Sequence, residues 1–211
     1  MPVPLEPSCP QAPASLPAST QGVPVTTSES ATDAPRTLEF TVVRVQPEEW
    51  QAHRDLRLEM LEDAPQAFWA RIEEVRERTE QEWRTEIAGP RIHLQARPLD
   101  GGPALGGIAV LPQGYTEEHV IPEDHAILVS MWVRPEARGR GISRELFRAA
   151  AELATQLGRP HLTLEVDSSN TRAIASYERF GFRPTGVTHP RLATGTQWVE
   201  YEAPPGALRL G

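Results

Sequence analysis

Residues 133–146, VRPEARGRGISREL, join a nearly continuous apolar run, 126–133, to a stretch whose apolar residues recur with helical spacing, 142–157. The glycine-rich turn between them leaves unpaired backbone N–H groups at the positive end of a helix dipole. Glycine also lets a ligand come close, because no Cβ stands in the way. Between 134 and 148, five arginines accompany two glutamates. The stretch therefore predicts a phosphate-binding turn between a buried strand and a helix.

Three kinds of nucleotide-binding turn compete for this stretch. The dinucleotide pattern GxGxxG fails because Arg144 occupies the place of its third glycine, and a P-loop fails because the chain contains no lysine. The remaining pattern, the pyrophosphate turn R-x-x-G-x-G/A, is matched by Arg138, Gly141 and Ser143, although serine departs from the usual glycine or alanine. An ordinary structural turn flanked by solvated arginines remains the alternative.

A second pattern lies downstream and combines a strand-like run with spaced polar and aromatic residues: LEV (164–166), Asn170, Ala173, Tyr177, Glu178 and GF (181–182). Seven residues, or two helical turns, separate Asn170 from Tyr177, so both side chains lie on one face of a helix and can serve one ligand. Taken alone, Asn170 is also explained as a helix N-cap. Tyr177 is also explained as part of an apolar core stripe with Ile174 and Phe180.

Together the two patterns resemble the GNAT superfamily of acetyl-CoA-dependent N-acetyltransferases. The resemblance covers nearly all of residues 38–203 in element order and is closest over 126–184. It implies an α/β fold with a mixed, mostly antiparallel central sheet flanked by helices, and acetyl-CoA as cosubstrate with no metal. It also implies the residues that contact the coenzyme: Met131, Trp132, Val133, Arg138, Gly139, Arg140, Gly141, Ile142, Ser143, Asn170 and Tyr177.

In this superfamily the end of the central strand splays away from the next strand, and its backbone groups hold the pantetheine arm. One N–H there polarises the thioester carbonyl, in the manner of an oxyanion hole. By that resemblance the backbone of Met131, Trp132 and Val133 holds the arm. Trp132 as an ordinary core residue is equally plausible.

Acetyl transfer from a thioester to an amine requires a general acid and a general base. An alkylamine of pKa about 10.4 is almost entirely protonated at neutral pH and must lose a proton before it attacks a thioester. Tyr177 is the candidate acid for the departing thiolate, and Glu165, on the strand face opposite Leu164 and Val166, is the candidate base. Glu165 is also explained as a solvated or paired surface residue. A proton relay through water from residues 123–125 and a lowered amine pKa on binding remain alternatives.

Outward from this stretch, the periodicity and the turn residues predict the remaining elements. The expected strands are 40–45, 91–96, 106–111, 126–133, 161–167 and two within 182–202, and the expected helices are 48–62, 68–87, 142–157 and one that starts near Asn170 and ends at Gly181. The order βααβββαβαββ defines one mixed α/β domain over 38–203. Residues 1–37, with eight prolines, predict a disordered leader or a partner-binding tail, and 204–211 predict a short tail.

The composition limits the kinds of molecule and metal ion that the protein is expected to bind. A net charge of −8 argues against sequence-independent binding to nucleic acid or to an anionic membrane. The single cysteine, Cys9, excludes a disulfide within the chain and fits a cytoplasmic location. The six histidines form neither an i, i+4 pair nor an HExxH pattern, so a zinc site is not expected. A homodimer remains open.

The sequence says less about the acceptor, the molecule that receives the acetyl group, than about the coenzyme. Four aromatic residues are candidates for its pocket, although each is more often a core residue: Phe68, Trp69, Trp83 and Trp198. The acidic balance suits a cationic acceptor such as a polyamine, an amino sugar or a peptide amine. Three functions stay open at this stage. They are direct acetyl transfer to a primary amine of a small molecule or peptide, acyl-CoA binding without catalysis, and protein interaction through the Pro-rich leader.

Overall fold

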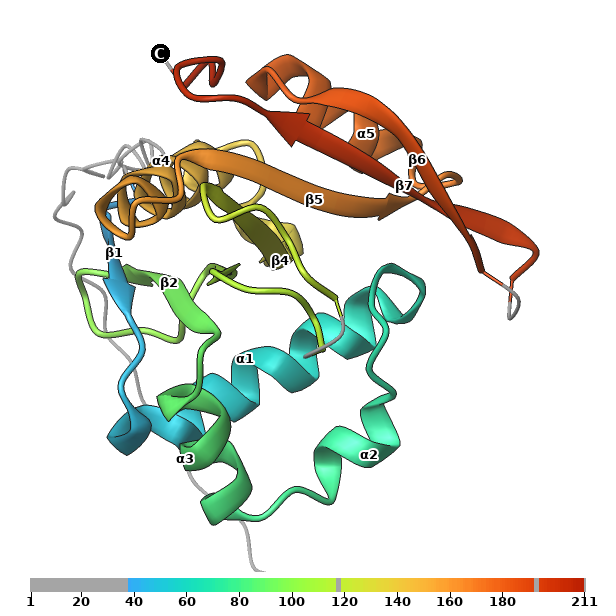
Figure 1. The fold of residues 1–211 in the computed structure, drawn as a ribbon. Helices are drawn as coiled ribbons and strands as arrows, with labels where there is room; N and C mark the ends of the chain where they lie inside the picture. The colour runs from blue at the N-terminus through green and yellow to red at the C-terminus, as the bar shows by residue number, and fades with distance from the viewer. Residues whose placement is uncertain (1–37, 117–118, 192–193, 211) are drawn as a thin grey trace, which may run out of the picture. The chain divides into compact units, whose positions relative to one another are not determined.

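A seven-stranded sheet with the order β1-β2-β3-β4-β5-β7-β6 organises the computed structural model (Figure 1). The structure describes residues 38–116, 119–191 and 194–210. The predicted leader and Cys9 lie outside these residues. The strands are β1 (Phe40–Arg44), β2 (Ile92–Pro98), β3 (Gly106–Leu111), β4 (His125–Val133), β5 (His161–Asp167), β6 (Arg183–Arg191) and β7 (Thr196–Ala203).

The strand pairing confirms the predicted mixed, mostly antiparallel sheet. β2 and β3 form the expected antiparallel hairpin, and only β4 and β5 run parallel. Their parallel pairing is short and joins only His125–Ile127 of β4 to His161–Thr163 of β5. β4 continues to Val133 and β5 to Asp167. The two strands therefore part in the middle of the sheet.

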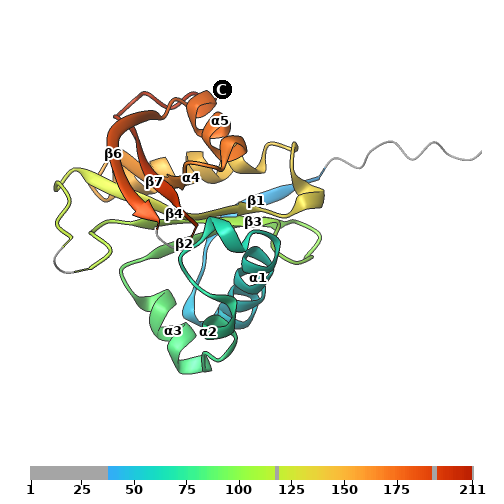
Figure 2. The same cartoon turned by 90° about the vertical axis from the view of Figure 1, so that its right-hand side faces the viewer.

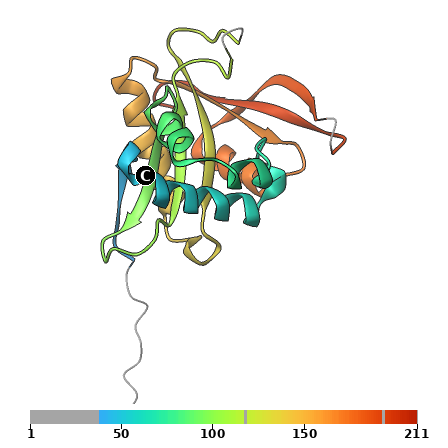
Figure 3. The same cartoon turned by 90° about the horizontal axis from the view of Figure 1, so that it is seen from below.

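Helices cover the two faces of the sheet. Figure 2 shows α4 and α5 on one side and α1, α2 and α3 on the other. Figure 3 shows α1 crossing the strands. The helices are α1 (Trp50–Asp63), α2 (Ile72–Arg76), α3 (Glu80–Ala88), α4 (Ile142–Gln156) and α5 (Thr171–Phe180). No helix in the described part of the chain is long and apolar enough to cross a membrane.

One predicted element differs from the structure. The second helix, expected over 68–87, is divided into α2 and α3. Thr79 starts the new helix as a capping box: its hydroxyl accepts from the Glu82 N–H, and the Glu82 carboxylate accepts from the Thr79 N–H at 2.7 Å. These bonds satisfy the free donors of a helix start, so a new helix begins where the apolar spacing indicated continuity.

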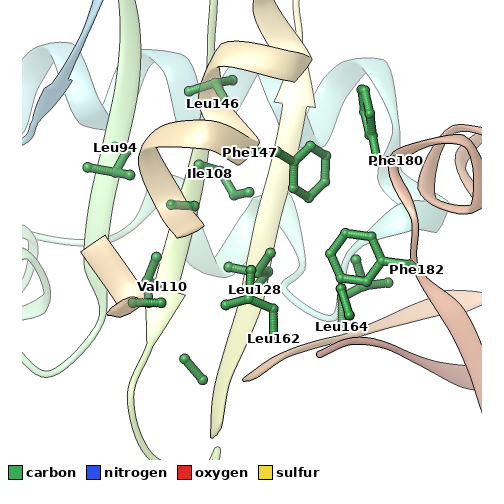
Figure 4. Close-up of a cluster of buried hydrophobic side chains, with 14 of the residues drawn as sticks. Leu94, Ile108, Val110, Leu128, Leu146, Phe147, Leu162, Leu164, Phe180 and Phe182 are labelled. Atoms are coloured by element: carbon green, nitrogen blue, oxygen red, sulfur yellow. The ribbon is translucent and has the colours of Figure 1, made fainter. Parts of the chain in front are cut away.

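The main core lies between the sheet and helices α4 and α5. Figure 4 shows Phe147 of α4 among Leu128, Leu164, Phe180 and Phe182. The predicted tail also packs here, since Leu208 and Leu210 contact this core and the Arg209 N–H donates to the Phe180 carbonyl at 2.9 Å. Residues 208–210 of the predicted tail therefore pack against the folded domain.

Candidate active site

A cleft opens where β4 and β5 part. It contains a cavity of about 100 Å³ between the two strands, α5 and the segment after α1. Its wall includes residues from both sequence patterns: Ala67, Phe68, Leu128, Met131, Phe147, Leu164, Glu165, Val166, Asp167, Asn170, Ala173 and Tyr177. The structure thus places the candidate acid and the candidate base around one cavity.

A bulge in β4 shapes this cleft. Gly107 opposes Trp132 and Ala109 opposes Val129, so β4 contains one residue more than β3 at this point. Ser130 takes up the difference with φ 56°, an uncommon left-handed conformation for a residue other than glycine. Beyond the bulge, Met131 lines the cleft, whereas Trp132 is buried against α1. β4 is no longer paired with β5 here, so β5 does not take up its backbone groups on that side.

The predicted phosphate turn leads directly into α4. Gly139 and Gly141 have φ values of 80° and 82°, and Gly141 is the N-cap of α4, with no side chain capping the helix. A Cβ at Gly139 would meet nothing within 4 Å. A Cβ at Gly141 would meet only the Arg144 guanidinium, at 3.3 Å, so the start of this 15-residue helix combines N–H groups without a side-chain cap with a nearby positive charge, which suits an anion.

The side chains of the turn differ in what they offer. Ile142 is buried in the core, so it can contribute to a ligand only through its backbone, while Arg140 is exposed and Ser143 half-buried. The Arg138 guanidinium bonds to the carboxylate of Asp63, at the end of α1, and donates to the Val133 carbonyl at 2.9 Å. The Arg138 side chain therefore faces protein groups.

Asn170 is the N-cap of α5, because its Oδ1 accepts from the Ala173 N–H at 3.2 Å, and it also lines the cleft. Tyr177, two turns later, lines the same cleft. The two side chains therefore border one cavity, and their contact with a ligand stays a prediction.

Tyr177 combines a packed ring with a free hydroxyl. Its ring meets Phe147 and Phe182 edge-on, with centroids 5.9 and 6.1 Å apart. Within the described residues no group hydrogen-bonds to its hydroxyl. Burial raises the Tyr177 pKa to about 12. The phenol is therefore protonated at neutral pH, as a proton donor must be.

Glu165, on β5, also lines the cleft, and its side chain is 13% exposed. Burial raises its pKa; His189, with Nε2 3.7 Å from the carboxylate, lowers it, and the Glu200 carboxylate raises it. Glu200 is the direct partner of Glu165 on β7. The neighbouring Tyr115 has its own pKa raised by burial and by the Glu165 charge. These effects make Glu165 a stronger base than a solvated glutamate.

Neither sequence pattern contains Glu200 or Tyr115. Glu200 could have been found only from the β5–β7 register, which places it beside Glu165. Tyr115 belongs to the connection between β3 and β4, and no periodic pattern fixes its position. Asp167 also lines the cleft, but it is bound by Ser169, Thr196 and Arg191. Burial raises its pKa, yet these hydrogen bonds outweigh burial and hold the pKa well below its usual range.

Of the other candidate residues, only Phe68 lines the cleft. Residues 123–125, the alternative proton relay, precede or begin β4 and do not line the cleft. Trp83 is fully buried beside Val75 in a core of its own. Trp69, 72% exposed, stacks on the buried Trp198 with ring centroids 5.3 Å apart, and neither residue lines the cleft.

In the described residues two groups outside the cleft have the spacing of metal ligands: Asp124 with His125 and His161, and His53 with Glu86 and His93. In the second group neither histidine Nε2 makes a hydrogen bond within the described residues, although His93 Nε2 lies 3.8 Å from the Glu86 carboxylate. Arg97 donates to the Gln95 amide oxygen at 3.0 Å, so the Gln95 nitrogen is the donor to His53 Nδ1 at 3.3 Å. The neutral His53 ring must then carry its proton on Nε2, the atom that a metal would need. This donor set does not favour a cation.

The comparisons with known proteins agree with this geometry. The acetyltransferase (GNAT) family model matches residues 46–182. Streptothricin acetyltransferase from Streptomyces lavendulae is 47% identical over 83 residues, 39% of this chain and 41% of that protein. The chain spans less than half the length of the curated relatives it matches.

Solved structures share the fold. A GCN5-related N-acetyltransferase from Kribbella flavida gives a TM-score of 0.60 at 22% identity, over 81% of this chain and 99% of that one. A Salmonella typhimurium protein solved with its cofactor acetyl-CoA gives 0.61 at 14% identity, over 79% and 94%. Because the family model matches more than half of its residues, the chain belongs to the acetyltransferase (GNAT) family, whose members transfer acetyl groups.

Proposed function

We propose that this protein transfers an acetyl group directly from acetyl-CoA to a primary amine, with Tyr177 as general acid and Glu165 as general base. The observation that carries the proposal is the cleft between β4 and β5, which brings both residues to one cavity. The end of β4 that is not paired with β5 borders this cavity, and the glycine-rich turn follows β4 in the chain.

The proposed coenzyme site uses mainly backbone groups. The amides of residues 139–143 bind the diphosphate, and the backbone of Met131–Val133, on the side of β4 that is paired with neither β3 nor β5, binds the pantetheine arm. Positive φ at Gly139 and Gly141, with open space beside Gly139, supports the close approach of a phosphate. Asn170 lies along the arm, from its place in the cleft wall.

The reaction begins with the loss of a proton from the bound ammonium group to Glu165, directly or through one water. The neutral amine attacks the thioester carbonyl, a C–N bond forms, and the C–S bond breaks. The thiolate, with a pKa of about 8.5 by analogy with cysteine, takes the proton of the Tyr177 hydroxyl. The nitrogen of the adduct, which still carries one proton more than the amide product, gives that proton to the Tyr177 phenolate, and Glu165 releases its proton to solvent. A backbone N–H at the end of β4 stabilises the oxyanion.

A cationic acceptor fits this site best. Glu165 and Glu200 stand opposite each other on β5 and β7, and no arginine pairs with either among the ion pairs of the described residues. The named relatives support an amine acceptor of small-molecule or protein origin, since they include a streptothricin acetyltransferase and a peptidyl-lysine N-acetyltransferase. We therefore propose an amine that carries a positive charge at neutral pH.

The proposal is tested in two steps on the full chain. A thermal-shift titration with acetyl-CoA reports binding, and a free-thiol assay over a panel of polyamines, amino sugars and peptides reports turnover. Stabilisation together with amine-dependent thiol release supports the enzyme. Stabilisation without release across the panel would indicate a binding module, and the absence of both would refute the coenzyme site.

The pH profile tests Glu165. We expect kcat/KM to fall at acidic pH as Glu165 becomes protonated, in a range above that of a solvated glutamate, because burial raises its pKa. Glu200→Gln removes a charge that also raises this pKa, so the acidic limb should move to lower pH. Glu202→Gln, two residues along the same strand, is the control and should leave the limb in place. An unchanged limb in Glu200→Gln would remove Glu165 as the titrating base.

A further inference from the structure

Asp63, the last residue of α1, holds together parts of the chain that are distant in sequence. Its Oδ2 accepts from the Trp132 indole N–H at 2.8 Å and from the Arg138 guanidinium. The Trp132 bond is the first cause of a lowered Asp63 pKa, so Asp63 is ionised at neutral pH. Its side chain is 28% exposed and that of Arg138 30%, so this is a partly buried pair. Such a pair fixes geometry better than a surface ion pair.

The two partners of Asp63 lie in the two segments expected to bind the coenzyme. Trp132 belongs to the free end of β4, and Arg138 begins the glycine-rich turn. Arg138 adds a second link, because its Nε donates to the Val133 carbonyl at 2.9 Å. One carboxylate thereby fixes the distance between the strand end and the turn.

A parallel link lies one helical turn earlier on α1. Glu59 binds Arg134, whose Nε donates to the Ala104 carbonyl at 2.7 Å. Glu59 and Asp63 are four residues apart and so lie on one face of α1. This face anchors the end of β4, and Ala67 and Phe68, just beyond α1, line the cleft. Asp63 thus lies at the junction of the proposed acceptor and coenzyme sides.

We propose that Asp63 is a positioning residue that aligns the backbone amides of the turn with the end of β4 for coenzyme binding. Arg138 acts as its partner, with the guanidinium held on protein groups and not on the diphosphate. The inference rests on the proposed function, since it needs a coenzyme at this turn. It adds a residue that neither sequence pattern contains.

The test uses calorimetric affinity for CoA together with steady-state kinetics. We expect Asp63→Asn to weaken CoA binding and raise the KM for acetyl-CoA about tenfold, with a smaller change in kcat, because the amides lose their alignment. Asp63→Glu should recover part of the affinity. Glu62→Gln, the neighbouring exposed carboxylate that pairs with Arg76, is the control and should bind as the wild type does.

A double-mutant cycle with Arg138→Gln separates positioning from direct phosphate contact. If Asp63 and Arg138 act as a unit, the double variant should bind CoA no more weakly than either single variant. Additive losses, or wild-type affinity in Asp63→Asn, would overturn the inference. If Asp63→Asn does not fold, the cycle is run with Asp63→Glu, where the same two outcomes decide. Absence of CoA binding in the wild type would instead refute the proposed function.

Discussion

Tyr177→Phe should lower kcat about a hundredfold while the affinity for acetyl-CoA stays within about twofold of the wild type. The substitution removes only the hydroxyl that would protonate the departing thiolate. The ring contacts with Phe147 and Phe182 remain, so the fold and the cleft wall should persist. Turnover is measured by free-thiol release and affinity by calorimetry. Because burial raises the Tyr177 pKa to about 12, the deficit should be constant from neutral pH to about pH 10.

Tyr201→Phe is the matched control for this experiment. Tyr201 is a buried tyrosine whose hydroxyl bonds to Glu178 at 3.3 Å, outside the cleft. Loss of the Tyr201 hydroxyl should lower the free energy of unfolding slightly and leave kcat unchanged. If Tyr177→Phe loses affinity and turnover equally, Tyr177 is a coenzyme contact and another group supplies the proton.

The elements nearest the glycine-rich turn could be predicted closely from the sequence. β3 and β5 match their predicted bounds, and α4 starts at the predicted Ile142, because strong periodicity and glycine or proline at the ends define them. Where a capping box interrupts a continuous apolar spacing, as at Thr79, the periodicity alone gave the wrong boundary. Local hydrogen bonds, and not the apolar spacing, determine where that helix begins.

The residues of the candidate site also fall into two groups: those that local periodicity places together, and those that only the three-dimensional fold brings together. Asn170 and Tyr177 share a helix face, and Glu165 alternates with the core residues of its strand, so helical and strand periods sufficed to group them. Glu200 reaches the site through strand register. Asp63 reaches its partners across 69 and 75 residues, a contact that no local pattern encodes. The bulge at Ser130 is equally hidden, since a left-handed serine has no sequence signal.

Gly141→Val should weaken acetyl-CoA binding about a hundredfold or more, which corresponds to about 2.8 kcal/mol. Gly141 has φ 82°, a conformation that costs an L-residue about 1–2 kcal/mol and a β-branched one more. The new side chain would also meet the Arg144 guanidinium, at 3.3 Å from its Cβ. Valine therefore forces the turn to rearrange, and the first amides of α4 no longer converge on a diphosphate. Calorimetric titration with CoA measures the effect.

The backbone strain is separated from the ligand effect by Gly158→Val. Gly158 lies just beyond the other end of α4 with φ 75° and open space around it, so valine there imposes a similar strain. We expect both variants to melt at a lower temperature than the wild type, but only Gly141→Val to lose CoA. If Gly141→Val retains wild-type affinity, the diphosphate does not bind at this helix start, and the proposed coenzyme site is in the wrong place.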